Sequence, residues 1–335
     1  MRRSDVIHAK TAAGYDLPVI DVTHPAFALP ESPQALEALR TQFRATEDRQ
    51  YWLSRPLMRL LMTLAARRSL MLRAMLRSDT PYLSGLSTYV MKLGVDNLVP
   101  PFDGPVDRKI AASAAVTSIR LRLQQTARLL AEGLAPELRA QPRTPLHLLN
   151  IGGGPAIDSL NALILLRRMD PGLLQRPVTV RVLDLDAEGP AFGQNALAAL
   201  QADGAPLAGL DIAFRHEPYD WNDTAILKRR MKTLTAHAAI IAASSEGALF
   251  DYADDAAIVA NLAALNAGGR GVRAVAGSLT RADETTHRML ANSPFKLVPR
   301  SVETFGRLAA RAEFAVAQVA PALLGDQVLL VPDRS

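Results

Sequence analysis

The chain has 335 residues, of which 49% are hydrophobic and 21% are charged, with 20 Gly and 22 Pro. This Gly and Pro content is about half of the roughly 25% share typical of low-complexity chains, so disordered and collagen-like classes are excluded. The absence of cysteine excludes a disulfide framework, a Cys-ligated zinc site and a thiol nucleophile. A chain of this length can form one large domain, or a typical domain with a substantial appendage.

The net charge of +5 comes from the N-terminal part of the chain. Residues 1–144 contain 20 Lys and Arg against 13 Asp and Glu, whereas the remaining residues contain 18 against 20. A basic segment can bind nucleic acid, but it also arises from helices with arginine-rich solvent-facing surfaces. Because only 5% of the residues are aromatic and no RNA-recognition domain is recognisable, we favour the second interpretation and expect no nucleic-acid partner.

The sequence has no segment with the length of a membrane-spanning helix. Its longest apolar runs, such as 238–243, fall far short of the ~20 apolar residues that span a bilayer. Asp5 and Lys10 interrupt the region where a secretory signal needs its apolar core. We therefore expect a cytoplasmic protein without a membrane partner.

Helices are predicted for most of the N-terminal part. Residues 31–77 have apolar positions at helical spacing, with Ser32 as the N-cap and a break at Pro56. The segment 80–105 is expected to be an ordered loop with one short helix. A long helix is predicted over 106–134, where apolar residues again recur at helical spacing.

The next stretch, 134–145, contains three prolines and is interpreted as a linker. It separates a helical lid domain, 1–145, from a second domain, 146–335. In the second domain apolar runs alternate with helical patterns, which indicates right-handed crossovers and a parallel sheet covered on both faces. The expected strands are LHLLNI, VTVRVLDLD, LDIAFRHEPY, AHAAIIAAS and VRAVAGS, followed by an antiparallel hairpin of FAVAQVA and DQVLLVPD. The predicted fold is α/β: a doubly wound, mostly parallel seven-stranded sheet with a terminal antiparallel hairpin, plus the N-terminal helical lid.

The sharpest motif is NIGGGPA, from Asn150 to Ala156, at the carboxyl end of the first predicted strand. Open α/β sheets bind ligands at this end, and glycines let a ligand approach the backbone closely. A nicotinamide dinucleotide site needs Gly or Ala as the sixth residue counted from Gly152, whereas the sequence has Ile157 there. A dinucleotide site is therefore excluded.

The same stretch resembles motif I of the class I S-adenosylmethionine-dependent methyltransferases, D/E-x-G-x-G-x-G. Asn150 stands at the acidic position and Ala156 at the third glycine, so the motif lacks the charge that would face the ammonium group of the cofactor. The resemblance covers residues 146–335 and includes the seven-strand order with its terminal hairpin. It implies S-adenosylmethionine as the cofactor. The loop residues that would hold it are Asn150, Gly152, Gly153 and Gly154.

The resemblance also implies roles for residues at the ends of the next strands. An acid after the second strand accepts hydrogen bonds from the ribose hydroxyls, and Asp184 fits this place best, with Asp186 as the alternative. After the third strand, Asp220 is expected near the adenine amino group, and Trp221 is expected to stack on the ring. The competing interpretation is that these acids cap a helix or form an exposed turn.

The fourth predicted strand ends in Ser245 and Glu246. These polar residues either contact the cofactor or acceptor, or begin the following helix. No spacing of His and acidic residues typical of a metal site appears, and no metal is expected.

The resemblance implies methyl transfer from S-adenosylmethionine to a small molecule in a pocket covered by the lid. An alternative is cyclisation of the cofactor, in which its α-amine attacks its γ-carbon and gives azetidine-2-carboxylate and methylthioadenosine. The chain is similar to such enzymes in size and in its helical N-terminal extension. Tyr89 and Asn150 are the candidate catalytic residues. A second alternative is an RNA-binding methyltransferase, and the acceptor and the oligomeric state stay open.

Overall fold

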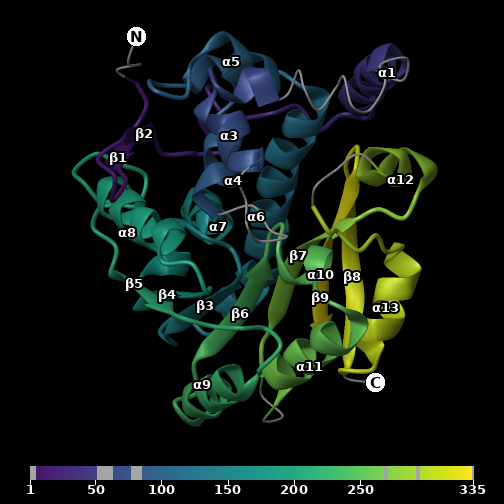
Figure 1. Cartoon of the computed structure of the whole chain (residues 1–335). Helices are drawn as coiled ribbons and strands as arrows, with labels where there is room; N and C mark the ends of the chain where they lie inside the picture. Colours follow the sequence, from purple (N-terminus) through teal and green to yellow (C-terminus); the bar gives the residue numbers. More distant parts are fainter. Residues whose placement is uncertain (1–4, 51–62, 77–84, 268–270, 292–294, 334–335) are drawn as a thin grey trace.

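A computed structural model describes residues 5–50, 63–76, 85–267, 271–291 and 295–333. Its centre is a seven-stranded sheet with the order β5-β4-β3-β6-β7-β9-β8 (Figure 1). The strands are β3 (Leu146–Ile151), β4 (Val178–Leu183), β5 (Ile212–Glu217), β6 (Ile240–Ser245), β7 (Ala274–Thr280), β8 (Phe314–Pro321) and β9 (Gly325–Pro332). A separate two-stranded sheet consists of β1 (His8–Lys10) and β2 (Asp16–Pro18).

The first five strands of the large sheet are parallel, so their carboxyl ends share one edge. β3 pairs in parallel with β4 and β6, β4 with β5, and β6 with β7. β9 is antiparallel to both β7 and β8. The predicted fold class, a mostly parallel seven-stranded sheet with a terminal antiparallel hairpin, is confirmed.

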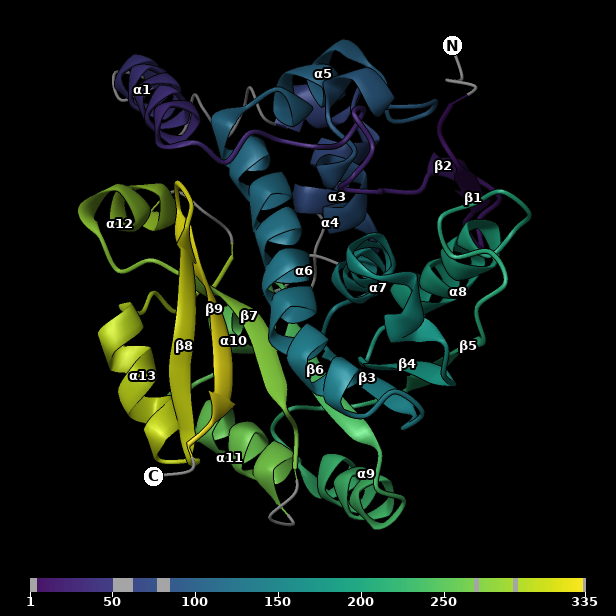
Figure 2. The ribbon, with the colours of Figure 1, turned by 180° about the vertical axis from the view of Figure 1, so that it is seen from behind.

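Helices cover both faces of the sheet because its strands have apolar residues pointing to either side. One face packs against α6 (Ala114–Ala140), α7 (Ile157–Met169) and α8 (Glu188–Leu200). The opposite face packs against α9 (Ala225–Ala236), α11 (Asp255–Asn266) and α13 (Val302–Ala310) (Figure 2). The remaining elements of this part are η2 (Pro171–Leu174), α10 (Leu249–Tyr252) and α12 (Glu284–Ala291).

Helix α6 lies lengthwise across β6, β7 and β9 (Figure 2). It starts at the N-cap Ser113 and is separated from the preceding α5 (Pro105–Ala111) by two residues, so the predicted long helix is in fact two helices. The linker interpretation of 134–145 is wrong for residues 134–140, which continue α6 through Pro136. The helix continues because Leu134 and Leu138 are fully buried, one turn apart, on its sheet-facing side.

The remaining N-terminal elements lie above the carboxyl edge of the sheet, with α4 next to α7 and α8 and with α1 on the other side of the molecule, above α12 (Figure 1). They are α1 (Pro33–Gln50), α3 (Leu70–Leu76), α4 (Gly85–Lys92) and η1 (Val95–Asn97). The predicted break at Pro56 falls outside the described residues. The predicted division of the chain at residue 145 stays a prediction.

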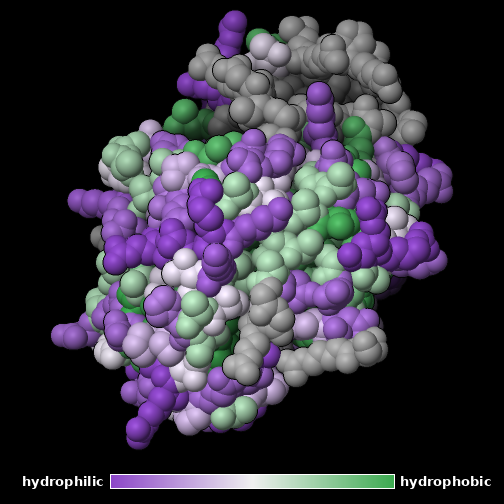
Figure 3. All heavy atoms as spheres, turned by 90° about the horizontal axis from the view of Figure 1, so that it is seen from below, coloured by the Kyte–Doolittle hydropathy of each residue, from purple (hydrophilic) through white to green (hydrophobic). Residues whose placement is uncertain are grey.

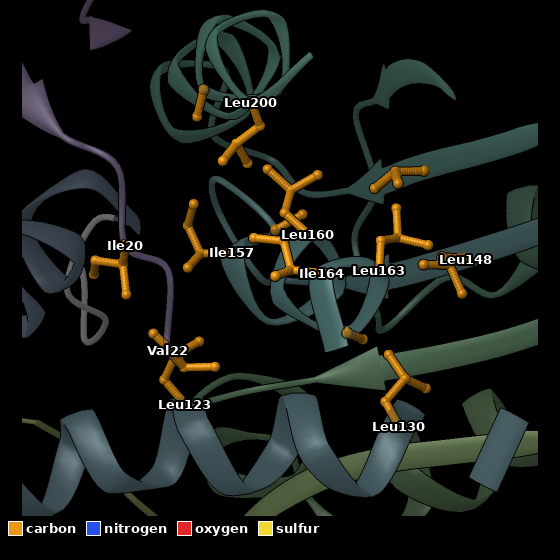
Figure 4. Packing of buried hydrophobic residues seen from close by; sticks show 14 of the residues in the cluster. Ile20, Val22, Leu123, Leu130, Leu148, Ile157, Leu160, Leu163, Ile164 and Leu200 are labelled. Atoms are coloured by element: carbon orange, nitrogen blue, oxygen red, sulfur yellow. The ribbon is translucent and has the colours of Figure 1, made fainter. Parts of the chain in front are cut away.

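The N-terminal segment is fixed to the sheet through Asn161 of α7. The Asn161 side chain accepts a hydrogen bond from the amide of Val22 at 2.8 Å and donates one to the carbonyl of Ile20 at 2.9 Å. Ile20 and Val22 pack in the same apolar cluster as Ile157 of α7 and Leu123 of α6 (Figure 4). The two parts of the chain therefore share one hydrophobic core.

Hydrophilic side chains cover most of the face seen in Figure 3, with hydrophobic residues between them. A search of the described helices finds none whose length and apolar character would let it cross a membrane.

Candidate functional site

The predicted site residues other than Tyr89 lie where β3, β4, β5 and β6 end. The chain leaves β3 through a tight loop, in which Gly152 (φ 66°), Gly154 (φ 53°) and Ala156 (φ 52°) adopt the left-handed conformation before α7 begins. Gly152 donates its amide to the carbonyl of Leu183, which ties the loop to the end of β4. The loop thus lies between the two strand ends that the resemblance assigns to the cofactor.

The glycines of this loop are required by the packing of the protein itself. A methyl group on Gly153 would lie 1.7 Å from Oδ1 of Asn150, and one on Gly154 would lie 2.7 Å from the Cα atom of Gly85. A methyl group on Gly152 would lie 2.7 Å from the Cβ atom of Ala248. These contacts explain the glycines without a ligand, and their contact with a cofactor stays a prediction.

Asp184 lies directly beside the glycine loop. Its two carboxylate oxygens each accept a backbone hydrogen bond at 2.9 Å, one from Gly154 and one from Asp186. Burial raises the pKa of this carboxyl, although both amides and the nearby His216 act against the shift. Each oxygen keeps a lone pair for a further donor. The neighbouring Leu185 is 70% exposed, so an apolar side chain stands in solvent next to this acid.

Asp186 serves a different purpose from Asp184. Its Oδ1 accepts a hydrogen bond from the amide of Glu188, the first residue of α8, at 3.0 Å. The helix-start interpretation therefore holds for Asp186.

Asp220 and Trp221 follow β5, the neighbour of β4. Asp220 is exposed, and its carboxylate accepts hydrogen bonds from the backbone and side chain of Asn222, as in an exposed turn. Trp221 is half-buried, and its ring would lie 3.0 Å from a methyl group placed on Gly152. The structure thus brings the indole ring onto the glycine loop, whereas Asp220 points into the surface turn.

The hydroxyl group of Ser245 forms its hydrogen bonds within the protein. Its hydroxyl donates to the carbonyl of Ile151 and accepts from the amide of Leu249, both at 2.9 Å. It joins β6 to β3 and begins α10, and its contact with a ligand stays a prediction.

Asn150, the residue at the acidic position of the motif, has a buried acid as a partner. Its Nδ2 donates to Oδ1 of Asp158 at 2.7 Å and lies 3.0 Å from the hydroxyls of Ser159 and Ser244. Within the described part of the chain, Asn150 Oδ1 and Asp158 Oδ2 are both buried without a hydrogen-bond partner. Burial raises the pKa of Asp158 and the charge of Glu246 adds to this effect, whereas hydrogen bonds with the Ser244 hydroxyl and the Ser159 backbone and the charge of Lys92 act against it. The site therefore contains a carboxyl group that the motif lacks.

A buried group of charges lies beside Asn150 and Asp158 at the end of β6. Lys92 of α4 and Arg122 of α6 both form ion pairs with the carboxylate of Glu246. Burial alone would raise the pKa of Glu246, but the charges of Arg122 and Lys92 outweigh it and hold that pKa below its ordinary value. Burial lowers the pKa of Lys92. We call Lys92, Arg122, Asp158 and Glu246 the charged cluster.

Asp251 fixes the loop that carries Glu246. Its carboxylate accepts hydrogen bonds from the hydroxyls of Ser278 at 2.5 Å and Thr280 at 2.6 Å, at the end of β7. Ser278 in turn accepts from the amide of Gly247 at 2.7 Å. Burial raises the pKa of Asp251, against the lowering effect of Arg122.

The hydroxyl group of Tyr89 is bonded to the N-terminal segment and not to the glycine loop. The hydroxyl accepts a hydrogen bond from the amide of Ile20 at 3.0 Å and donates one to the carbonyl of Pro18 at 2.5 Å. Burial raises the pKa of this phenol far above its ordinary value. The ring packs against Phe192 with 4.7 Å between centroids. Tyr89 thus holds the N-terminal segment, and its catalytic role stays a prediction.

Sequence reasoning named Glu246 but missed Lys92, Arg122 and Asp158. Lys92 and Arg122 lie on helices that are far along the chain from Glu246 and carry no local motif. Asp158 could have been found, because it is an acid in the first turn of an otherwise apolar buried helix. Among the residues covered by the structure, no three His, Asp or Glu side chains are grouped so that they could hold a metal ion.

The order of the strands matches the order that the motif resemblance implies. The chain has the fold of the class I S-adenosylmethionine-dependent methyltransferases. No protein-family model and no curated protein matches its sequence.

Several solved structures are similar to this chain. The pyocyanin biosynthetic protein PhzM has 15% identity and a TM-score of 0.39 over 70% of this chain and 59% of its own. Magnesium protoporphyrin IX methyltransferase from Synechocystis PCC 6803, with bound SAH, has 12% identity and a TM-score of 0.42 over 65% and 86%. A possible exported protein from Bordetella parapertussis has 15% identity and a TM-score of 0.49 over 90% and 99%. The match to PhzM spans less than two thirds of that protein's length.

Proposed function

We propose that this protein is an S-adenosylmethionine-dependent transferase that acts on a small molecule. The observation that carries the proposal is the order in which certain side chains lie along the carboxyl edge of the sheet. Trp221, Leu185 and Asp184 stand at the ends of β5 and β4, the glycine loop follows β3, and the charged cluster lies at β6. S-adenosylmethionine has an adenosine end and an aminocarboxylate end. The residues at β4 and β5 match the first in chemical character, and the charged cluster matches the second.

The residues at β4 and β5 fit an adenosine. Asp184 is half-buried and keeps two acceptor lone pairs, which suits the vicinal hydroxyls of a ribose. Leu185 and Trp221 offer an exposed aliphatic and a half-buried aromatic surface for a base. In this proposal Asp184 holds the ribose, and Asp186 accepts the amide of Glu188 at the start of α8.

The charged cluster and the neighbouring Asn150 fit the aminocarboxylate end of the cofactor. Asn150 Oδ1 and Asp158 Oδ2 are buried acceptors without a partner among the described residues, and such atoms suit a donor group supplied by a ligand. When bound, the cofactor supplies an electrophilic methyl group. The protein then contributes position and exclusion of water, because the transition state of methyl transfer disperses charge.

The first test is binding of S-adenosylhomocysteine to the purified chain, measured by calorimetry. Saturable binding with one site per chain supports the proposal, and no binding up to millimolar concentration overturns it. The second test is incubation with S-adenosylmethionine and candidate small-molecule acceptors, followed by mass spectrometry. S-adenosylhomocysteine that appears only with an acceptor supports methyl transfer. Methylthioadenosine formed without any acceptor would replace methyl transfer by cyclisation of the cofactor.

A further inference from the structure

A cavity of about 250 Å³ lies between α1 and α12, where β7 ends and β8 turns into β9 (Figure 1). Its lining comes from α1, from the residues that follow β7 and from the turn between β8 and β9. We call it the α1–α12 cavity. Of the described residues that line it, none belongs to the glycine loop or the charged cluster. A ligand bound there would therefore occupy a second site, separate from the candidate functional site.

The most deeply buried residues of this lining are apolar. They are Phe43 of α1 and Leu323 of the β8–β9 turn, which are 7% and 5% exposed. Both pack in a small hydrophobic cluster with Leu39 of α1 and Ala114 of α6. Because this packing holds the two side chains in place, the cavity has a preformed apolar surface. A ligand with an apolar body would remove that surface from water, which favours binding.

The cation that follows β7 is already neutralised by the protein. Arg281 donates to both carboxylate oxygens of Asp326, from Nε at 3.0 Å and from Nη2 at 2.5 Å. Its Nη1 lies 3.8 Å from the carboxylate of Asp283. Asp283 also accepts the amide of Thr286 at 2.8 Å, at the start of α12. These charges fix one wall of the cavity and balance one another.

The cations on the α1 wall are not balanced in this way. Arg40 and Arg44 both line the cavity, four residues apart on the helix. Arg40 Nη1 is 3.3 Å from Glu37 Oε2, but the Glu37 side chain is 60% exposed, so solvent weakens this pair. Arg44 has no hydrogen-bond or ion-pair partner among the described residues. Like charges four residues apart repel each other, and an anion in the cavity would relieve that repulsion.

The lining selects one class of anion. The planar guanidinium group of arginine matches a carboxylate with two parallel hydrogen bonds. An inorganic anion would leave Phe43 and Leu323 uncovered, whereas a carboxylate on an aromatic or aliphatic body would cover them. The volume lies just below the roughly 300 Å³ at which pockets for drug-sized ligands begin, so the ligand is smaller than that class.

We propose that the α1–α12 cavity binds a small organic carboxylate, with its carboxylate on Arg40 and Arg44 and its apolar body on Phe43 and Leu323. This site goes beyond the proposed function and does not depend on it. The bound carboxylate joins α1 to the β8–β9 turn, and it thereby holds a helix of the N-terminal part against the end of the sheet.

The experiment titrates three probes into the full chain by calorimetry at low ionic strength, where charges are least screened. Benzoate has both the carboxylate and an apolar body. Acetate keeps the carboxylate with almost no body, and benzamide keeps the body without the charge. The proteins are the wild type, Arg40→Gln and Arg44→Gln, with the exposed Arg139→Gln of α6 as the matched control. Thermal unfolding shows that each variant is folded.

We expect benzoate to bind the wild type and Arg139→Gln at one site per chain, with a Kd in the millimolar range or below. Acetate and benzamide should each bind about tenfold more weakly, since each lacks one of the two contacts. Arg40→Gln and Arg44→Gln should each weaken benzoate binding by about tenfold, the effect of losing a hydrogen bond to a charged group. Their affinity for benzamide should be that of the wild type.

Three results would overturn the proposal. The first is the absence of saturable benzoate binding to the wild type. The second is a wild type that binds acetate or benzamide as tightly as benzoate, because the apolar surface or the charge would then contribute nothing. The third is wild-type benzoate affinity in both Arg40→Gln and Arg44→Gln, which would place the probe elsewhere on the chain.

Discussion

Asp184 and Gly154 are joined by a hydrogen bond of 2.9 Å between the carboxylate Oδ2 and the backbone amide. The bond links the end of β4 to the loop that follows β3. A change at Asp184 therefore alters both the acid proposed to hold the ribose and the position of the glycine loop.

We expect Asp184→Ala to weaken S-adenosylhomocysteine binding by about 1.5–3 kcal/mol, the range for a hydrogen bond to a charged group. Asp186→Ala should have a smaller effect, because Asp186 Oδ1 already accepts a hydrogen bond from the amide of Glu188, the first residue of α8. Because burial raises the pKa of Asp184, wild-type affinity should start to fall at a higher pH than for an ordinary Asp as the solution is acidified. Calorimetry across pH measures both effects. A larger loss of affinity in Asp186→Ala than in Asp184→Ala would show that Asp184 is not the acid that holds the ribose.

Tyr89→Phe removes a hydroxyl that holds the backbone of Pro18 and Ile20. The buried amide and carbonyl then lack their partner, and we expect the unfolding free energy to fall by about 1–3 kcal/mol. Tyr15→Phe, whose ring also packs against an aromatic ring, is the control. Denaturant titration gives the comparison. A folded Tyr89→Phe of wild-type stability without product formation would establish the catalytic role instead.

Glu246→Gln leaves Lys92 and Arg122 without their shared counter-charge in a buried place. Breaking such a pair costs about 3–5 kcal/mol. The control is Glu303→Gln, whose exposed pair with Arg307 should contribute less than about 1 kcal/mol. Both values come from unfolding in urea. Equal losses in the two variants would show that the charges of the cluster are hydrated.

The buried carboxyl of Asp158 should make stability depend on pH. Its pKa is raised in the folded state, so the folded chain holds this proton more tightly than the unfolded chain does. Stability therefore falls as the pH rises from the ordinary Asp pKa to the raised one. We expect Asp158→Asn to match the wild type in acid and to exceed its unfolding free energy at neutral pH. A variant that is less stable than the wild type at neutral pH would contradict this sign.

Gly133 tests the contact of α6 with the sheet. A methyl group there would lie 2.8 Å from Cδ1 of Leu329 and 3.2 Å from Cβ of Ala274. We expect Gly133→Ala to destabilise the chain by about 1 kcal/mol, although alanine favours helices more than glycine does. Gly306→Ala in α13 is the matched control, since its methyl group would meet only Val316 at 3.7 Å and should stabilise. Equal Tm changes in the two variants would contradict the close packing of α6.

The sequence predicts the sheet well because strands and helices are local patterns. Each of the seven strands overlaps its expected run, and the ends of β6, β7, β8 and β9 differ from the run by one or two residues, since alternation of apolar runs and glycine-containing turns is visible over a few residues. The end of α6 is not predictable in this way. Its last turns are completed by Arg176, which donates to the carbonyls of Leu138 and Gln141 at 2.7 Å from beyond the next strand and helix.

The site is predictable only in part, for the same reason. The glycine motif and Asp184 are marked by their place after strands. The partners of Glu246 are 154 residues away at Lys92 and 124 residues away at Arg122, and only the folded chain brings them together.

Helix α6 contributes both to the core and to the candidate site. Its C-terminal half packs on β7 and β9, and Arg122 in its N-terminal half forms an ion pair with Glu246. An exchange of N-terminal segments between chains of this fold has to keep both contacts of α6. A chimera joined at residue 145 would bring a foreign helix onto the sheet and would alter its core. A junction at 112–113, between α5 and α6, keeps the sheet covered and exchanges only the elements before it, so functional recombinants should cluster at that junction.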